Sequence, residues 1–239
     1  MRVFCISDPH LGRDMSRFGE VWVDHEARIA ANWRALVGEG DLVLIPGDFS
    51  WATTNKTIVR HLEFIDELPG LKVLSPGNHD KWWKKRERLR PRSILLLDDR
   101  HHALGADWTL VATMGCEQPE SPWWEESMRP EFESACRALE GSLRAAERER
   151  PGTKILLMIH YPPRWDRKDE PSAFEEIIAR YPVDTLVYGH IHGVDLPRAF
   201  NEVVRIFGKP VRYENASVDR TRMAPILILD DPTIAFRLD

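Results

Sequence analysis

The chain has 239 residues, of which 43% are hydrophobic and 30% are charged, and its formal net charge is −5. This composition is ordinary for a globular protein in solution and excludes a disordered chain. A dedicated duplex-DNA-binding protein is disfavoured, because such proteins usually carry a basic excess. The three cysteines are an odd number without metal-ligand spacing, so we expect reduced thiols and a cytoplasmic location.

The sequence gives no reason to expect a membrane protein. The first apolar run, residues 3–6, has only the length of a strand, so a signal peptide is not expected. No run approaches the roughly 18 apolar residues of a membrane span, so membrane insertion is not expected either.

Taken in chain order, short apolar runs alternate with segments of helical spacing. Near-continuous runs of four or five apolar residues are typical of strands covered on both faces, and they occupy residues 3–6, 42–45, 71–74, 155–159 and 185–188. Apolar residues at helical spacing predict helices over about residues 21–37, 55–68, 130–148 and 172–180, with Asn55 as a capping residue. This alternation indicates an α/β fold with a largely parallel central sheet.

Further predicted strands lack helices between them and occupy residues 94–97, 108–113, 203–207, 226–229 and 234–236. They suggest a second sheet with more antiparallel pairing. No linker, internal repeat or low-complexity tract interrupts the pattern, so we expect one domain over residues 1–239.

Each of the five buried strands ends in His, Asp or Asn, and five of the nine histidines lie at these ends. In open α/β sheets, functional residues gather outside the carboxyl ends of the strands. A single Asp or Asn there is more often a turn or cap residue. Together, however, these residues favour a metal site, because unpaired charge is costly to bury. The candidates are Asp8, His10, Asp48, Asn78, His79, Asp80, His160, His190 and His192.

Residue spacing supports a site for two cations. Asp8 and His10 are two positions apart, so both point to one side of an extended segment and can hold one cation. His190 and His192 are about 6.5 Å apart along a strand, which suits two cations roughly 3.5–4 Å apart. Asp48 has two oxygens and can bridge such a pair. Carboxylate, carboxamide and imidazole without thiolate favour Mn²⁺ or Fe, with Zn²⁺ possible.

The order of these blocks resembles that of the calcineurin-like metallophosphoesterase superfamily. The matching blocks span residues 8–192 and read Asp8-Pro-His10, Gly47-Asp48, Gly77-Asn78-His79-Asp80, His160 and Gly189-His190-Ile191-His192. Trp82-Trp83, directly after the third block, also resembles a bacterial subgroup of predicted phosphohydrolases. The resemblance implies an α/β fold, a four-layer α/β/β/α sandwich with two mixed β-sheets and a two-metal centre.

The resemblance also implies a role for each residue. The first metal is expected on Asp8, His10 and His192, and the second on Asn78, His160 and His190. Asp48 is expected to bridge the two metals. His79 is expected to be an acid beside the leaving group without binding metal, and Asp80 is expected to orient His79.

These assignments predict a dinuclear-metal-dependent phosphoesterase acting on a phosphodiester or phosphomonoester of a small molecule or nucleotide. A hydroxide bridging the metals is the expected nucleophile of an in-line attack, and His79 supplies a proton or hydrogen bond to the leaving alkoxide. One alternative is a metal-dependent nuclease on single-stranded nucleic acid, which the net charge of −5 disfavours. The other alternative is a non-catalytic scaffold. It is disfavoured because every expected metal-ligand position carries a residue that can bind a metal.

Local sequence narrows the substrate class. The protein Ser/Thr phosphatase branch carries an arginine shortly after the second-block aspartate, and residues 49–53 contain none, which counts against a phosphoprotein substrate. Trp51 and Trp82 are candidates to stack on a planar group at the rim of the site, although any one tryptophan is more often core. Arg13 and Arg164 lie near the first and fourth blocks and are candidate phosphate ligands. The natural substrate, the native metal pair and the oligomeric state stay open.

Overall fold

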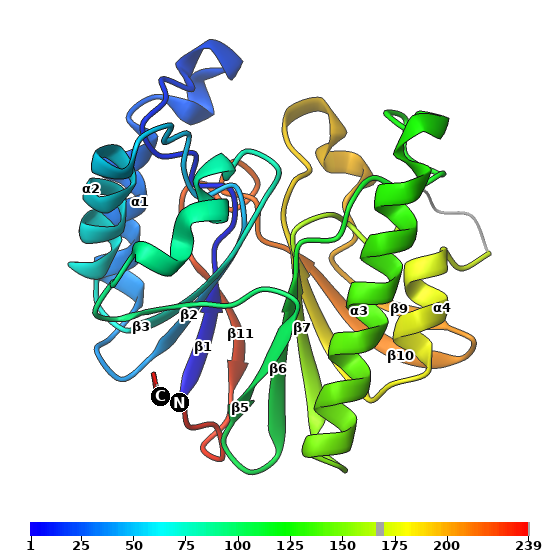
Figure 1. Ribbon diagram of the computed structural model, residues 1–239. Coiled ribbons are helices and arrows are strands. Elements are labelled where there is room, and N and C mark those ends of the chain that lie inside the picture. Colours follow the sequence, from blue (N-terminus) through cyan, green and yellow to red (C-terminus); the bar gives the residue numbers. More distant parts are fainter. Residues whose placement is uncertain (166–169, 239) are drawn as a thin grey trace.

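Two β-sheets face each other at the centre of the computed structural model, which describes residues 1–165 and 170–238 (Figure 1). The first sheet has the strand order β11-β1-β2-β3-β4, and only β11 is antiparallel to its neighbour. Its strands are β1 (Arg2–Cys5), β2 (Leu42–Pro46), β3 (Leu71–Ser75), β4 (Ile94–Leu96) and β11 (Ile226–Asp230).

The second sheet has the order β5-β6-β7-β8-β10-β9 and is parallel in its centre, with an antiparallel strand at each edge. Its strands are β5 (Arg100–Leu104), β6 (Trp108–Thr113), β7 (Lys154–Ile159), β8 (Val183–Tyr188), β9 (Val203–Ile206) and β10 (Lys209–Asn215). Both sheets are therefore mixed, as the resemblance implied.

Helices cover the outer face of each sheet (Figure 1). The first sheet carries α1 (His25–Leu36) and α2 (Asn55–Asp66), and the second carries α3 (Arg129–Glu149) and α4 (Ala173–Ala179). Short 3-10 helices complete the chain: η1 (Ser16–Phe18), η2 (Glu20–Trp22), η3 (Lys81–Arg88), η4 (Glu126–Met128) and η5 (Gly193–Arg198). Among the described helices, none combines the length and apolar character that a membrane crossing needs.

Side-chain oxygens begin two of these helices. The Thr54 hydroxyl accepts the Thr57 amide at the start of α2, so Thr54, rather than the predicted Asn55, is the cap. At the start of α4, Ser172 and Glu175 form a reciprocal capping box. Each such cap contributes about 1 kcal/mol.

Three apolar layers hold the four-layer sandwich together, and β2 explains how. Leu42 and Leu44 lie in the layer between the sheets, whereas Val43 and Ile45 pack toward α1 and α2. Successive side chains of a strand point to opposite faces, so a strand covered on both faces must be apolar throughout. The continuous apolar runs in the sequence are the result.

Assignment of strands to sheets corrects part of the prediction. The five motif strands do not form one central sheet, because β1, β2 and β3 belong to the first sheet and β7 and β8 to the second. β4 and β11 were expected in the second sheet but pair with β3 and β1. Residues 234–236 form no strand, although Ile234 and Phe236 fill the layer between the sheets.

The sequence analysis missed two strands, β5 and β10. β5 reads Arg-His-His-Ala-Leu and has an exposed or half-exposed surface along most of its length. β10 alternates buried and half-exposed residues and contains Pro210, which weakens its signal as a strand. β5 pairs with the next strand, β6, in a tight hairpin, and β10 pairs with β9 and β8. Both strands were therefore missed because of their weak apolar pattern.

Replacing Leu44 by Ala is expected to lower the free energy of unfolding by about 2–5 kcal/mol, because this side chain is fully buried between the sheets. Leu227→Ala on β11 is the matched control; that side chain is 47% exposed, and its loss is expected to cost less than about 1 kcal/mol. Urea unfolding followed by tryptophan fluorescence measures both. Equal losses would contradict the inter-sheet position of Leu44.

Candidate metal centre

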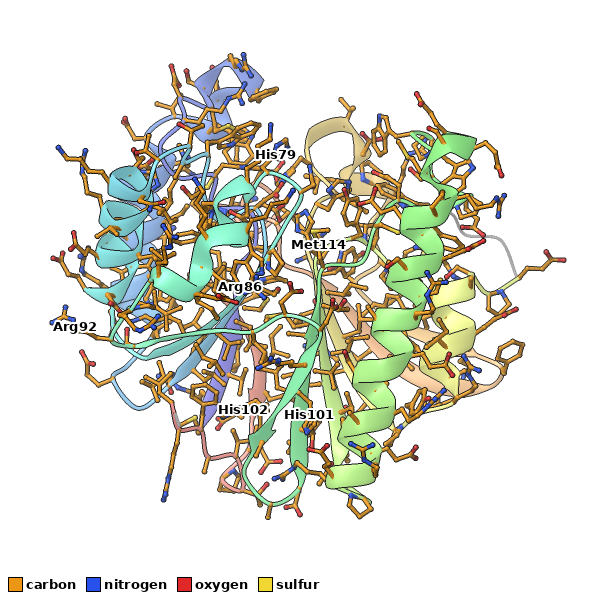
Figure 2. The ribbon with its side chains drawn as sticks, in the orientation of Figure 1. His79, Arg86, Arg92, His101, His102 and Met114 are labelled. Atoms are coloured by element: carbon orange, nitrogen blue, oxygen red, sulfur yellow. The ribbon has the colours of Figure 1, made fainter. Side chains whose placement is uncertain are left out.

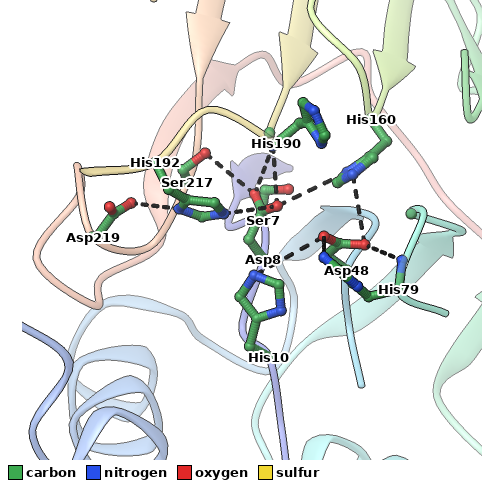
Figure 3. A network of polar contacts seen from close by, with 12 residues as sticks. Ser7, Asp8, His10, Asp48, His79, His160, His190, His192, Ser217 and Asp219 are labelled. Carbon is green, nitrogen blue, oxygen red and sulfur yellow. Dashed lines mark hydrogen bonds and ion pairs between the residues drawn. The ribbon is translucent and has the colours of Figure 1, made fainter. Parts of the chain in front are cut away.

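The strand ends of both sheets meet at one edge of the molecule, at the top of Figure 1, and Figure 3 shows the polar network there. Two groups of side chains each bring their ligand atoms within 4.8 Å of one another. One group contains Asp8, His10 and His192, and the other contains Asp48, His160 and His190. Predicted ligands separated by up to 184 positions in the chain (192 − 8) therefore converge in space.

In the first group, His192 bridges two carboxylates. Its Nδ1 lies 2.8 Å from Oδ1 of Asp219, and its Nε2 lies 3.1 Å from Oδ1 of Asp8. Burial lowers the pKa of His192, but the charge of Asp8 and the hydrogen bond to Asp219 outweigh it and raise this pKa to about 10. The space between His192 and Asp8 thus strongly favours positive charge.

The second group is built from atoms that can only accept. A carbonyl oxygen cannot donate, so Nδ1 of His160 donates to the Pro46 carbonyl 2.9 Å away and leaves a lone pair on Nε2. That lone pair faces Oδ1 of Asn78 at 3.0 Å. Nε2 of His190 likewise faces the Glu117 carboxylate at 3.2 Å, which leaves its Nδ1 3.1 Å from the same Asn78 oxygen. Lone pairs in such proximity repel each other unless a cation lies among them.

Asp48 lies between the two groups. Its Oδ1 is 3.6 Å from Nε2 of His160, and its Oδ2 is 4.0 Å from Nε2 of His10. Burial and the charge of Asp8 raise the pKa of Asp48 to about 7, so this carboxylate needs nearby positive charge to stay ionised at neutral pH. The donor set of carboxylates, imidazoles and one carboxamide fits a pair of divalent cations.

Backbone conformation aims these side chains. Asp8, His10, Asp48 and His190 all adopt left-handed backbone angles, with φ of 60°, 48°, 48° and 67°. Such angles cost of order 1–3 kcal/mol for a residue with a side chain and cluster at functional sites. The strain is maintained here by hydrogen bonds between the two sheets, for example from the His190 amide to the Asp8 carboxylate at 3.0 Å.

Glycines let the two sheets approach at this edge. A Cβ on Gly189, after β8, would collide with Asp8 and Ser7 of the first sheet. A Cβ on Gly47, after β2, would collide with Nδ1 of His160 in the second sheet. The glycines before Asp48 and His190 are therefore required by close packing at the site and are more than turn residues.

His79 lies beside the two groups, with its side chain one-third exposed and its Nε2 3.8 Å from Oδ2 of Asp48. The Trp51 ring lies against it, with ring centroids 4.0 Å apart and planes tilted by 31°. Burial, together with the neighbouring His160 and His190, lowers the pKa of His79 to about 4. The ring is therefore neutral near pH 7 and can still donate an N–H hydrogen bond.

Asp80, which we expected to orient His79, makes its hydrogen bonds to backbone amides and to a tryptophan. Its two oxygens accept the backbone amides of Gly77, Phe49 and Ser50 at 2.9–3.1 Å and the indole N–H of Trp82 at 2.8 Å. These bonds tie the loop after β3 to the loop after β2. Asp80 thus influences His79 through the shared backbone.

Some of the candidate substrate-binding residues lie at the metal centre, and others lie in the core. Arg13 places its guanidinium 3.8 Å above the Trp51 ring, and Trp51 donates to Nδ1 of His10 at 3.0 Å, so both lie at the metal centre. Trp82 is only 6% exposed and packs in the core against Phe49 and Trp83, which removes it from the rim.

Arg164 is also removed from the proposed role. It is nine-tenths buried and forms an ion pair with Glu175 at 2.6 Å, and Tyr213 donates to the same carboxylate. These contacts tie the loop after β7 to α4 and β10. The guanidinium is therefore engaged within the protein core.

Histidines outside the motif blocks have structural contacts. His101 and His102 lie on β5, at the opposite end of the molecule from His79 (Figure 2). His101 pairs with Glu149 at 3.1 Å, and His102 contacts the Arg237 carbonyl. His61 contacts the Ser50 hydroxyl at 2.7 Å.

Sequence analysis missed the outer carboxylates Asp219 and Glu117. Asp219 follows β10, a strand that the sequence pattern did not predict, and Glu117 follows β6, a predicted strand. A polar side chain shortly after a predicted strand is a signal that indicates Glu117 but does not reach Asp219. Each one fixes the proton on a ligand histidine, as outer carboxylates do in metal sites.

A family model described as calcineurin-like phosphoesterase matches residues 1–194. The chain therefore belongs to the calcineurin-like metallophosphoesterase family. Its four-layer fold and its two clusters of His and Asp ligands agree with this membership.

Solved structures of other proteins are similar to this chain over nearly its whole length. A crystal structure of phosphopantetheinyl hydrolase from Mycobacterium tuberculosis superposes with a TM-score of 0.54 at 17% identity, over 99% of this chain and 98% of that chain. A protein of unknown function from Aquifex aeolicus gives a TM-score of 0.52 at 18% identity, over 95% of each chain. At these identities the likeness concerns the fold.

One curated relative is the Gene 66 protein of Mycobacterium phage L5. It is 36% identical over 78 residues, which is 31% of this chain. The match covers 37% of the length of that protein.

Asp219→Asn and Glu117→Gln are each expected to weaken binding of one cation by about 10–100-fold, because a neutral amide replaces the charged acceptor that fixes the proton of the ligand histidine. Titration calorimetry with Mn²⁺ measures the affinity and the number of sites. Glu133→Gln is the control, since this side chain is 57% exposed on α3. Unchanged affinity at both sites in both variants would rule out this role for the two carboxylates.

Proposed function

We propose that this protein hydrolyses phosphodiesters or phosphomonoesters of small molecules with a pair of divalent cations. The observation that carries the proposal is the convergence of carboxylate and imidazole groups from both sheets around Asp48. Asp8, His10 and His192 would hold one cation, and Asn78, His160 and His190 the other. Mn²⁺ and Fe are our preferred cations, and Zn²⁺ is possible.

The cation pair would supply Lewis-acid chemistry, namely a water of lowered pKa and compensation of charge on the phosphoryl oxygens. The protein side chains do the positioning. Asp48 would hold the two cations at a fixed separation. His79 is one-third exposed next to this bridge, so its N–H would donate to the oxygen of the leaving group.

Cavity size favours a small substrate over a polynucleotide. Two cavities of about 460 and 470 Å³ flank the centre, one beside Asn78 and Tyr161 and the other beside His10 and His79. Both volumes fall in the range of small-molecule sites, roughly 300–1,000 Å³. The net charge of −5 adds to the argument against a nuclease. We propose a cytoplasmic enzyme acting on a small phosphorylated compound.

A substrate panel tests the proposal. The purified protein is incubated with p-nitrophenyl phosphate, bis-p-nitrophenyl phosphate, cyclic nucleotides or single-stranded DNA, each with Mn²⁺ and with a chelator. Metal-dependent hydrolysis of a small ester is expected. Preference for single-stranded DNA would favour the nuclease, and no hydrolysis with Mn²⁺, Fe²⁺ or Zn²⁺ would favour the scaffold.

Asp48→Asn is expected to reduce turnover to the level of the chelator-treated protein, because one neutral amide cannot serve both cations. The rate of hydrolysis of p-nitrophenyl phosphate with Mn²⁺ is the measurement. Asp195→Asn, in η5 and outside both ligand groups, is the control. Near-parental activity of Asp48→Asn would remove Asp48 from the mechanism.

His79→Ala is expected to keep both cations and to lose roughly 10²–10⁴-fold in kcat, with the largest loss for poorly acidic leaving groups. Metal content by mass spectrometry and kcat across a series of aryl phosphates measure the two effects. If the variant lost metal in proportion to activity, His79 would be a ligand and not a hydrogen-bond donor.

A further inference from the structure

A cavity of about 470 Å³ opens from the metal centre between two segments far apart in the chain. One segment contains η1 and η2, and the other begins η5 at Gly193. His10, His79 and His192 form its inner end, so whatever occupies the cavity touches the site of chemistry. We refer to it as the aromatic cavity.

Apolar side chains form most of the remaining wall. Met15 and Trp22 are at most 5% exposed and belong to the first core layer, whereas Phe18 is 56% exposed and Val194 is 93% exposed. Phe18 and Val194 come from the two different segments, and both line the cavity. Exposed large apolar residues that gather beside a catalytic centre are typical of a binding surface.

The charge in this cavity has one sign. Arg13 lies over the Trp51 ring at 3.8 Å, and Arg17 lies over the Phe18 ring at 4.6 Å. Among the described residues that line the cavity, there is no carboxylate. The cavity on the other side of the centre differs, because its lining contains both lysines and carboxylates, namely Lys81, Lys84, Asp98, Asp99 and Glu131. An apolar group attached to an anion fits the aromatic cavity better than a sugar or a cation.

The position of His79 assigns a direction to the substrate. His79 lines the aromatic cavity, whereas Asn78 and Asp80 line the other cavity. A group that donates a hydrogen bond to the leaving oxygen must lie on the side of the leaving group. The leaving alcohol therefore belongs in the aromatic cavity, if the proposed function holds.

We propose that the aromatic cavity binds the alcohol part of the substrate, and that the substrates are phosphate esters of aromatic or otherwise apolar alcohols. Phe18 and Val194 cover the alcohol from opposite segments. Arg13 and Arg17 also line this cavity, and their positive charges favour the negative charge of the ester.

Two esters with leaving groups of similar acidity test the assignment: phenyl phosphate and 2-naphthyl phosphate with Mn²⁺. The second ring is expected to raise kcat/KM by about 10-fold, from the additional apolar area that it buries. Phe18→Ser and Val194→Ser are each expected to bring the ratio of kcat/KM for 2-naphthyl phosphate to kcat/KM for phenyl phosphate close to one. Phe207→Ser is the matched control, because Phe207 is 70% exposed at the distant turn between β9 and β10.

Binding without turnover separates the two proposals. Calorimetry with 2-naphthylphosphonate, which cannot be hydrolysed at an ester bond, is expected to show weaker binding in Phe18→Ser than in Phe207→Ser. If the phosphonate binds in this way but no ester is hydrolysed, the proposed function fails and the cavity assignment survives. Three outcomes would overturn the cavity assignment. The first is equal kcat/KM for the two esters, and the second is the same ratio of these two kcat/KM values in Phe18→Ser and Phe207→Ser. The third is a higher kcat/KM for a nucleotide than for 2-naphthyl phosphate.

Discussion

Two buried carboxylates, Asp8 and Asp48, lie close together at the junction of the two sheets and impose a requirement for positive charge. A buried charge without a partner is strongly destabilising, and two like charges aggravate the cost. The surrounding histidines answer this requirement in part, which the raised pKa of His192 reflects. The lone pairs of His160 and His190 do not, because their N–H groups point outward. A pair of cations would satisfy all of these atoms together.

The centre extends well beyond the residues that bind directly. Pro46, Glu117 and Asp219 come from three different strand ends, and each accepts the outer N–H of one ligand histidine. This arrangement sets which ring nitrogen is free for a cation. Glycines at the junction allow the sheets to approach, and left-handed backbone angles turn the ligands inward. Fold stability and site geometry are therefore coupled at the same few loops.

The two cavities beside the metal centre differ in the chemistry of the side chains that line them. The side next to His79 is apolar and carries arginines on aromatic rings, whereas the side next to Asn78 mixes lysines with carboxylates. Trp51 links the aromatic cavity to the metal centre, because its ring lies against His79 while its N–H contacts His10. On the cavity assignment proposed above, substrate selection would depend on segments, η1, η2 and η5, that contribute no strand to the sandwich.

The residue types at the strand ends and the burial of β1, β2 and β7 on both faces are properties of local sequence, so the sequence by itself determined them. It also determined the approximate helices and the order of the site blocks. Only the tertiary structure decided that the motif strands divide between two sheets, that β4 and β11 join the first, and that Trp82 and Arg164 are engaged in the core. It also added Asp219 and Glu117 to the centre. Those outcomes depend on which remote segment packs against which, and a local pattern of apolar and polar residues does not encode its partner.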